Sequence, residues 1–336
     1  MNSNELQKII KEKIEGQGTM IDLGNALPVV LRALSDRMSG TVDVTVKIHS
    51  KKKNATEDDW EDDIEGVSGT LIVKGFDVFG NALPVQEIPF VGEAGAGTID
   101  INLPAHQGDT IAVLAKIAGK GASCQLVTKV VKETTLEPEV YPAGLYEMGD
   151  GALSLNPGEE MYKGTVIVTE DFAILWPAYQ REGAADETVQ FGPLGQVIPS
   201  VLITEDEAEA FKDFDGALNT AAILSVFAGD CAARVASKPT PSALYNATGF
   251  FLPSMGILKY LYDHKAEINA FITAENEAYG PETDYQLIPK WSVWSSTLYD
   301  GAAQVWYVNL SNGNAFKFFR DSGFGVVAVS AFQTLY

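Results

Sequence analysis

Apolar residues recur with helical spacing in the first 40 residues of the chain. One stripe follows Ser3, whose hydroxyl can cap a helix, and a second stripe follows Pro28. The positions in the two stripes are Leu6, Ile9, Ile10, Ile14 and Val30, Leu31, Leu34, Met38. Because two short amphipathic helices cannot bury such stripes alone, residues 1–40 are predicted to be a helical assembly segment through which the chain joins a homo-oligomer or a virion.

The spacing changes to a period of two at Thr41. Val42, Val44, Val46 and Ile48 alternate with polar residues, as in a half-buried strand. Further strands are predicted at 70–76, 85–90, 98–103, 110–118 and 125–131. Short strands at this spacing predict an immunoglobulin-like β-sandwich over residues 41–140. The lysines at 51–53 and the acidic run at 57–65 are predicted to form a solvated loop, and 134–142 has the composition of a linker.

Residues 141–336 mix strands with helices. Hairpins are predicted at 144–155 and 164–176, followed by helices near 205–214 and 220–236. Ser254 is predicted to cap a further helix that runs to about residue 272, and 292–336 return to strands. The chain is therefore predicted to be a multidomain protein of the α+β and all-β classes, with an α+β domain over residues 141–336.

Charge excludes two classes of partner. The chain has 45 acidic and 24 basic residues and a formal net charge of −21, which repels phosphate backbones and anionic lipid headgroups. No stretch approaches the roughly 20 consecutive apolar residues that span a bilayer, and the start, MNSNELQKIIKEKIEG, has no secretory signal. Neither nucleic acid nor membrane insertion is predicted.

The sequence offers little for metal or covalent chemistry. Cys124 and Cys231 lie far apart, and His49, His106 and His264 show no metal-ligand spacing. The chain contains no nucleophile elbow, no phosphate-binding glycine loop and no H-E-x-x-H motif. A non-enzymatic protein with no cofactor and no metal is therefore predicted.

Five segments of the last region resemble, in order, the C-type-lectin-like variable proteins of diversity-generating retroelements and related domains of phage and gut-bacterial surface proteins. DGALNT is similar to the family's D-G-x-x-N-T, GFFLPS to its G-W-x-L-P-S, and WSST to its W-S-S-T. WYVNLSNG is similar to its W-x-V-x-F-x-x-G, and VVAVSAF to its closing V-R-x-V-x-A-F. These segments are 215–220, 249–254, 294–297, 306–313 and 326–332. The chain departs from the family pattern at Phe250, Ile257 and Val327.

The resemblance implies a lectin-like scaffold whose residues near the C-terminus vary to bind different targets. It further implies display on a phage tail, where the partner is a host-surface protein or glycan; the alternative is a structural or adhesive protein of a bacterial cell surface. Calcium-dependent lectins carry E-P-N and W-N-D triplets, and the aspartate is missing after Trp306 to Asn309. The sulfatase activators that share this fold use a cysteine pair, whereas Cys231 stands alone in the region.

The terminal strands predict a binding face from their pattern alone. Trp306, Val308 and Leu310 alternate with more polar positions and are assigned to the core. Asn312-Gly313 is typical of a two-residue type I′ hairpin. That turn predicts three facing pairs on the outer side, Ser311 with Asn314, Asn309 with Phe316, and Tyr307 with Phe318, and it places Phe319 in the core opposite Trp306.

Rigid aromatic side chains beside arginine and small polar residues are typical of recognition surfaces. The loop at 299–301 is predicted to lie beside the hairpin, and 320–324 to extend the surface. The predicted ligand-binding residues are Tyr299, Asp300, Gly301, Tyr307, Asn309, Ser311, Asn314, Phe316, Phe318, Arg320, Asp321, Ser322 and Phe324.

Overall fold

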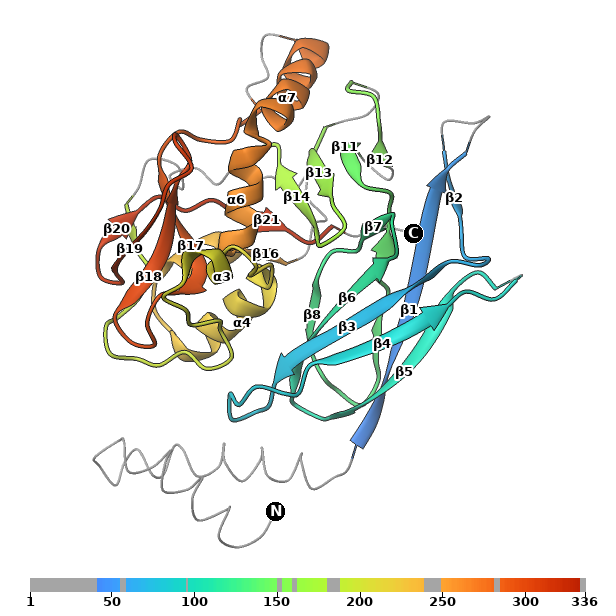
Figure 1. The fold of residues 1–336 in the computed structure, drawn as a ribbon, viewed down its shortest axis with the longest axis horizontal. Coiled ribbons are helices and arrows are strands. Elements are labelled where there is room, and N and C mark those ends of the chain that lie inside the picture. The colour runs from blue at the N-terminus through green and yellow to red at the C-terminus, as the bar shows by residue number, and fades with distance from the viewer. Residues whose placement is uncertain are drawn as a thin grey trace, which may run out of the picture.

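The computed structural model describes residues 41–54, 59–94, 96–149, 153–158, 162–179, 188–238, 249–280 and 285–332. The predicted helical segment 1–40 lies outside the described residues. Strands outnumber helices in the described part of the chain. Two β-sheets stacked on each other lie on one side of the molecule, and a mixed region with the helices lies on the other (Figure 1).

The first sheet is organised around one long strand. β1 pairs antiparallel with β5 and then with β2 along one edge, and in parallel with β9 and β10 along the other. Val44, Val46 and Ile48 are fully buried, which confirms the predicted alternation. The strands are β1 (Thr41–Lys53), β2 (Trp60–Asp62), β5 (Ile99–His106), β9 (Thr134–Leu136) and β10 (Glu139–Val140).

The second sheet has the order β4-β3-β6-β7, with β8 also paired to β6. Leu71 and Val113 from this sheet share one hydrophobic core with Val46 of the first sheet. The chain therefore forms a two-sheet sandwich, and the strands predicted at 70–76, 85–90 and 110–118 are present within it. Its strands are β3 (Ser68–Phe76), β4 (Gln86–Val91), β6 (Thr110–Ile117), β7 (Gly121–Ala122) and β8 (Leu126–Lys129).

Two sequence predictions about loops are wrong. The segment 134–142 is not a linker, because β9 and β10 pair in parallel with β1. The lysines at 51–53 belong to β1 and face β2, where Lys51 pairs with Asp62 at 3.0 Å. Charged side chains occupy strand positions here because cross-strand partners of opposite charge face them.

The boundary predicted near residue 140 does not separate two independent cores. Tyr146, Val166 and Leu175 from the last region belong to the same hydrophobic cluster as Val46 and Leu71 of the sandwich. Phe332, near the C-terminus, also packs into this cluster. Burying each such side chain contributes about 1.5–3 kcal/mol, so the sandwich and the last region stabilise each other.

The last region is built on a six-stranded sheet of order β12-β11-β13-β14-β21-β16. All pairings within it are antiparallel. The C-terminal strand β21 returns to pair between β14 and β16, which closes the region on itself. The strands are β11 (Gly144–Met148), β12 (Leu153–Ser154), β13 (Gly164–Val168), β14 (Ala173–Pro177), β16 (Phe250–Phe251) and β21 (Val329–Ser330).

The helices are shorter than their apolar patterns predict. The helix expected at 220–236 is divided at 227–231, and the helix expected from Ser254 to 272 is divided at His264. Ser254 occupies the N-cap position, but its hydroxyl donates to the Asp213 carbonyl and caps nothing. The helices are α3 (Glu207–Ala210), α4 (Gly216–Val226), α5 (Ala232–Ser237), α6 (Met255–Asp263) and α7 (Lys265–Tyr279).

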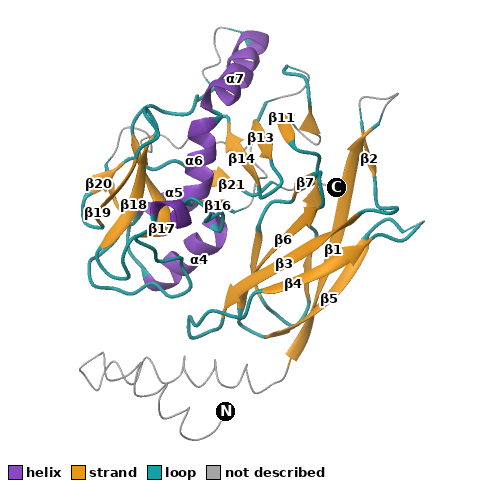
Figure 2. Ribbon diagram, in the orientation of Figure 1, coloured by secondary structure: helices purple, strands orange, loops and turns teal. Residues whose placement is uncertain are grey.

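A separate three-stranded sheet, β17-β18-β19, carries the predicted binding hairpin. Helix α6 packs between it and the six-stranded sheet, since Leu258 and Leu261 share a core with Ile174 and Val308. The hairpin therefore lies on the side of the molecule away from the sandwich (Figures 1 and 2). The remaining strands are β15 (Val189–Gln190), β17 (Ser292–Leu298), β18 (Gln304–Asn309), β19 (Ala315–Phe319) and β20 (Gly323–Phe324).

Candidate recognition surface

The hairpin register differs by two residues from the predicted one. Tyr307 lies opposite Phe316 instead of Phe318, and Trp306 lies opposite Lys317 instead of Phe319. The Asn309 amide donates to the Asn314 carbonyl at 3.0 Å, so a four-residue loop closes the hairpin. A shift of two preserves the side-chain alternation, and for this reason the predicted faces are confirmed although the predicted pairs are wrong.

The turn at Asn312-Gly313 is not type I′. That turn needs a positive φ at both positions, and only Gly313, with φ of 74°, has one. Asn309 determines the wider loop, because its side-chain oxygen accepts from the Ser311 amide at 2.9 Å and from the Ser311 hydroxyl. The Gly313 amide donates to the Asn309 carbonyl at 2.8 Å. These local hydrogen bonds compete with the tighter turn.

Four aromatic side chains from β18, β19 and the neighbouring strand β20 gather on one side of this sheet, and we call them the aromatic face: Tyr307, Phe316, Phe318 and Phe324. Tyr307 and Phe324 are half-buried. The Tyr307 ring stacks on Phe324 at 4.2 Å between centroids and on Phe316 at 5.6 Å. Phe318 meets Phe324 edge-on at 5.7 Å. Phe316 and Phe318 are 45% and 44% exposed, as predicted. The two exposed phenylalanines are thus connected through the half-buried rings of Tyr307 and Phe324.

A buried tryptophan packs beside the aromatic face on the same side of the sheet, because Trp294 lies opposite Tyr307. Trp294 on β17 is fully buried and meets Phe324 edge-on at 4.7 Å and Tyr307 at 6.2 Å. Its indole nitrogen donates to the Val189 carbonyl at 2.7 Å, which joins the face to the strand paired with β20. Packing that fixes the rings lowers the entropy lost when a partner binds. This support was not predicted from the sequence, although the WSST segment contains Trp294.

The predicted loop residue Tyr299 lies beside the hairpin but on the other side of the sheet. The Lys317 ammonium lies 3.8 Å from the centre of the Tyr299 ring and also donates to its hydroxyl. Tyr299 meets Trp306 edge-on at 5.2 Å. Phe319 was expected in the core, but it is 49% exposed because the register places it opposite Gln304 at the strand end. Lys317 and Phe319 are surface residues that sequence reasoning missed.

Arg320 does not belong to the exposed surface, so its predicted role in binding is wrong. Its side chain is fully buried and donates to the Gln196 carbonyl at 2.7 Å and the Asp300 carbonyl at 3.3 Å. Its guanidinium carbon lies 5.8 Å from the centre of the Phe191 ring. Burial lowers the pKa of this guanidinium, and the nearby Asp300 carboxylate opposes that shift. Arg320 therefore anchors the loops behind the hairpin.

Asp300 organises the loop that leads into the hairpin. Burial acts to raise its pKa, but the backbone amides of 302–304 donate to its carboxylate, and with the Arg320 guanidinium they hold the pKa below its usual value. Asp300 stays ionised and structural. Of the other predicted residues, Ser311, Asn314 and Asp321 are exposed, whereas Gly301, Asn309 and Ser322 are half-buried.

Three of the five resembling segments meet at one buried residue, Asp213. Its carboxylate accepts from the Thr297 hydroxyl at 2.7 Å and the Asn219 amide at 2.9 Å, and its carbonyl accepts from the Ser254 hydroxyl at 2.6 Å. Burial, then the charge of Asp215, raises its pKa to about 6, against these hydrogen bonds. The segments 215–220, 249–254 and 294–297 are thereby joined below the three-stranded sheet.

Within the described ranges, no group of three or more histidine, cysteine, aspartate or glutamate side chains is placed to hold a metal ion. None of the described helices is long and apolar enough to cross a membrane. Both cysteines are buried and reduced, and burial raises the pKa of the Cys124 and Cys231 thiols. A thiol with a raised pKa is a poor nucleophile.

Comparisons with known proteins identify no family. No protein-family model matches the chain, and no curated protein matches it significantly. Among solved structures, the chain is similar to a fimbrial protein from Bacteroides ovatus, with 14% identity and a TM-score of 0.42 over 87% of this chain and 71% of that one. Because the TM-score lies below 0.5, this likeness supports no conclusion about function.

Proposed function

We propose that the chain is a non-enzymatic binding protein that recognises a partner through the aromatic face. The observation that carries the proposal is the chain of contacts from Phe316 through Tyr307 and Phe324 to Phe318, held in place by the buried Trp294 ring beside it. Phe316 and Phe318 are exposed and are joined through the half-buried rings of Tyr307 and Phe324. Exposed apolar patches mark interaction sites in soluble proteins. Aromatic anchors on rigid elements supply most of the binding energy in many interfaces.

We further propose that the scaffold is a C-type-lectin-like domain of the retroelement variable-protein type, preceded by an immunoglobulin-like sandwich. The convergence of three family-like segments on Asp213 supports this assignment. So does the return of β21 to the sheet that opens the region. In such a scaffold the buried network maintains the fold, while the outer side chains of β18 and β19 are free to differ between relatives.

The proposed site of display is a phage tail, with a bacterial host surface as the partner. The second candidate is an adhesive or structural protein of a bacterial cell surface, in which the aromatic face is one wall of a subunit contact. The two candidates make opposite demands on the face: in the first it binds another molecule, and in the second it binds a copy of the same chain.

The test replaces both exposed rings, as Phe316→Ser with Phe318→Ser, in the full-length chain. A matched control replaces two exposed valines by serine: Val91 at the end of β4 and Val85 just before it, which are 66% and 57% exposed. We expect binding to bacterial envelope fractions to fall more than about tenfold for the phenylalanine variant and to persist for the control.

Equal binding by both variants would contradict the proposal. Sedimentation of the same proteins separates the two candidates. If the wild-type chain self-associates and the phenylalanine variant does not, the aromatic face is a subunit contact and the second candidate holds.

A further inference from the structure

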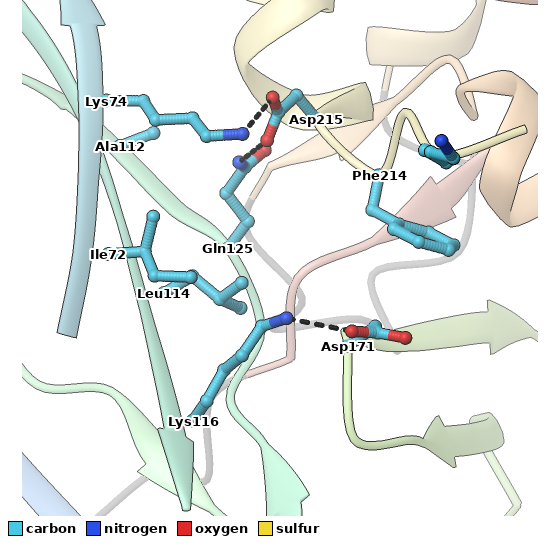
Figure 3. A pocket seen from close by; sticks show the side chains of 10 residues that line it. Ile72, Lys74, Ala112, Leu114, Lys116, Gln125, Asp171, Phe214 and Asp215 are labelled. Carbon is cyan, nitrogen blue, oxygen red and sulfur yellow. Dashed lines mark hydrogen bonds and ion pairs between the residues drawn. The ribbon is translucent and has the colours of Figure 1, made fainter. Parts of the chain in front are cut away.

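A cavity lies between the sandwich and the last region, away from the aromatic face. Its volume is about 360 Å³, within the ~300–1,000 Å³ range of small-ligand sites. One wall is the outer side of the sheet formed by β3 and β6, and the other comprises the turn between β13 and β14 and the loop before α4 (Figure 3). The residues lining it are Ile72, Lys74, Ala112, Leu114, Lys116, Gln125, Asp171, Lys212, Phe214 and Asp215.

The floor of the cavity is apolar although it faces away from the sandwich core. Ile72 and Leu114 are paired across β3 and β6, and both remain only half-buried. Their neighbours Leu71 and Val113 point the other way, into the core. Phe214 lies across the cavity from this floor (Figure 3). A half-exposed apolar floor facing an aromatic ring suits a ligand with a flat apolar side.

An ion pair stands at each end of the floor. Lys74 pairs with Asp215 at one end, and Lys116 pairs with Asp171 at 2.9 Å at the other (Figure 3). Lys116 lies opposite Thr70, four residues along β3 from Lys74, so the two ends are ~13 Å apart at 3.3 Å per residue. Each pair joins the sheet to the last region, which holds the walls at a set separation.

The ion pair at each end of the floor carries no net charge and uses only some of its hydrogen-bonding positions. A third lysine of the lining, Lys212, pairs at 2.6 Å with Glu209, which lies outside the lining, so each of the three lysines already has a carboxylate partner. An ammonium has three donors and a carboxylate about four acceptor positions, and each ion pair uses only one of each. An ionic ligand would have to displace an existing pair, whereas adjacent hydroxyl groups can donate to the carboxylate and accept from the ammonium together.

Gln125 holds one end of the cavity in place. Its amide nitrogen donates to Asp215 at 3.1 Å, and its oxygen accepts from the Leu218 amide at 3.1 Å. Asp171 lies on a turn fixed by Thr169, whose hydroxyl accepts from the Asp171 and Phe172 amides. Because both ends are held by the fold, the polar groups are preorganised, which favours binding of a small ligand.

We infer that this cavity binds a neutral saccharide of one or two rings, whose paired hydroxyl groups contact one or both Lys–Asp pairs and whose C–H face packs on Ile72, Leu114 and Phe214. The inference goes beyond the proposed function, because the site is remote from the aromatic face and shares no residue with it.

The test uses saturation-transfer NMR and calorimetry on the full-length chain. The probes are the common neutral hexoses, 6-deoxyhexoses and N-acetylhexosamines with their disaccharides, and uronic acids and free amino acids serve as ionic comparisons. Two variants address the cavity. Asp171→Ala removes the carboxylate at one end, where the side chain is 58% exposed, and Leu114→Trp fills the space above the floor. Asp62→Ala is the matched control, since Asp62 pairs with Lys51 outside the cavity at similar exposure.

We expect at least one neutral saccharide to bind, with affinity reduced at least fivefold by Asp171→Ala and lost in Leu114→Trp, and unchanged in Asp62→Ala. The double serine variant at Phe316 and Phe318 should retain this binding even if it loses its macromolecular partner. The inference is overturned if no neutral saccharide in the set binds, if binding survives both cavity variants, or if only the ionic probes compete for the site.

Discussion

Glu275 on α7 is expected to weaken the fold as the pH rises, and its replacement by glutamine should remove that effect. The side chain is fully buried, and so is Glu147 on β11. One Glu275 oxygen accepts from the Gly158 amide at 3.0 Å, while the other has no hydrogen-bond partner among the described residues. Burial, and then the charge of Glu147, raises the pKa of Glu275 to about 8, with the Gly158 amide opposing the shift.

The direction of the pH effect follows from proton linkage. In the unfolded chain Glu275 titrates near its usual 4.5, whereas in the folded protein it stays protonated up to about pH 8. Between these values unfolding releases a proton, so the free energy of unfolding falls by up to ~1.4 kcal/mol per pH unit. The stability that the protonated Glu275 side chain contributes is fully present below pH 4.5 and is lost as the pH approaches 8. At pH 7 the loss amounts to at most about 3 kcal/mol.

Glutamine keeps the acceptor for Gly158 and is neutral at every pH. The stability gained by Glu275→Gln should therefore grow by roughly 2–4 kcal/mol between pH 5 and pH 8. Urea unfolding followed by circular dichroism at several pH values measures this difference. Glu277→Gln, at an exposed position of the same helix, is the control and should show no such trend. A gain that is the same at pH 5 and pH 8 would mean that Glu275 is ionised in the folded protein.

Two further predictions concern the hairpin and the network beneath it. Trp306→Ala should lower the free energy of unfolding by about 3–5 kcal/mol, because the ring is 5% exposed. Phe318→Ala should change it by no more than about 0.5–1 kcal/mol. Equal losses for the two variants in chemical denaturation would mean that the two faces of the hairpin are misassigned. Thr297→Val removes the hydroxyl that donates to Asp213 and accepts from the Met255 amide. It should cost about 1–3 kcal/mol, and an unchanged midpoint of thermal unfolding would show that this pair of hydrogen bonds contributes nothing.

Alternation of side chains was visible in the sequence wherever one side of a strand is buried. Val44, Val46 and Ile48 were assigned to one core face, and the structure buries all three. The same period of two separated Trp306 and Val308 from the outer side chains of β18. Such assignments hold because alternate residues of a strand point to opposite sides of the sheet, so the spacing of apolar residues along the strand shows which side is buried.

Contacts between residues that are distant in the sequence cannot be seen in its hydrophobic pattern. β9 and β10 are short, and parallel pairing with β1 defines them, so 134–142 looked like a linker. Arg320 sits among residues of recognition-like composition, yet the Gln196 carbonyl, 124 positions away, draws it into the interior. A charged side chain is buried only when such acceptors are provided, and composition alone does not reveal them.

The sequence by itself determined which side of each strand faces the core, the places where helical and strand spacing begin, and the aromatic character of the terminal hairpin. The hairpin register is set locally too, by the hydrogen bonds of Asn309 to Ser311 and Gly313, although the Asn312-Gly313 pattern predicted a tighter turn. Only the tertiary structure decided the meeting of distant segments at Asp213, the burial of Glu275 beside Glu147, and the cavity between β3, β6 and the last region. The reason is physical: periodicity is a property of neighbouring residues, whereas hydrogen-bond partners, desolvation and cavities arise from chain segments brought together by folding.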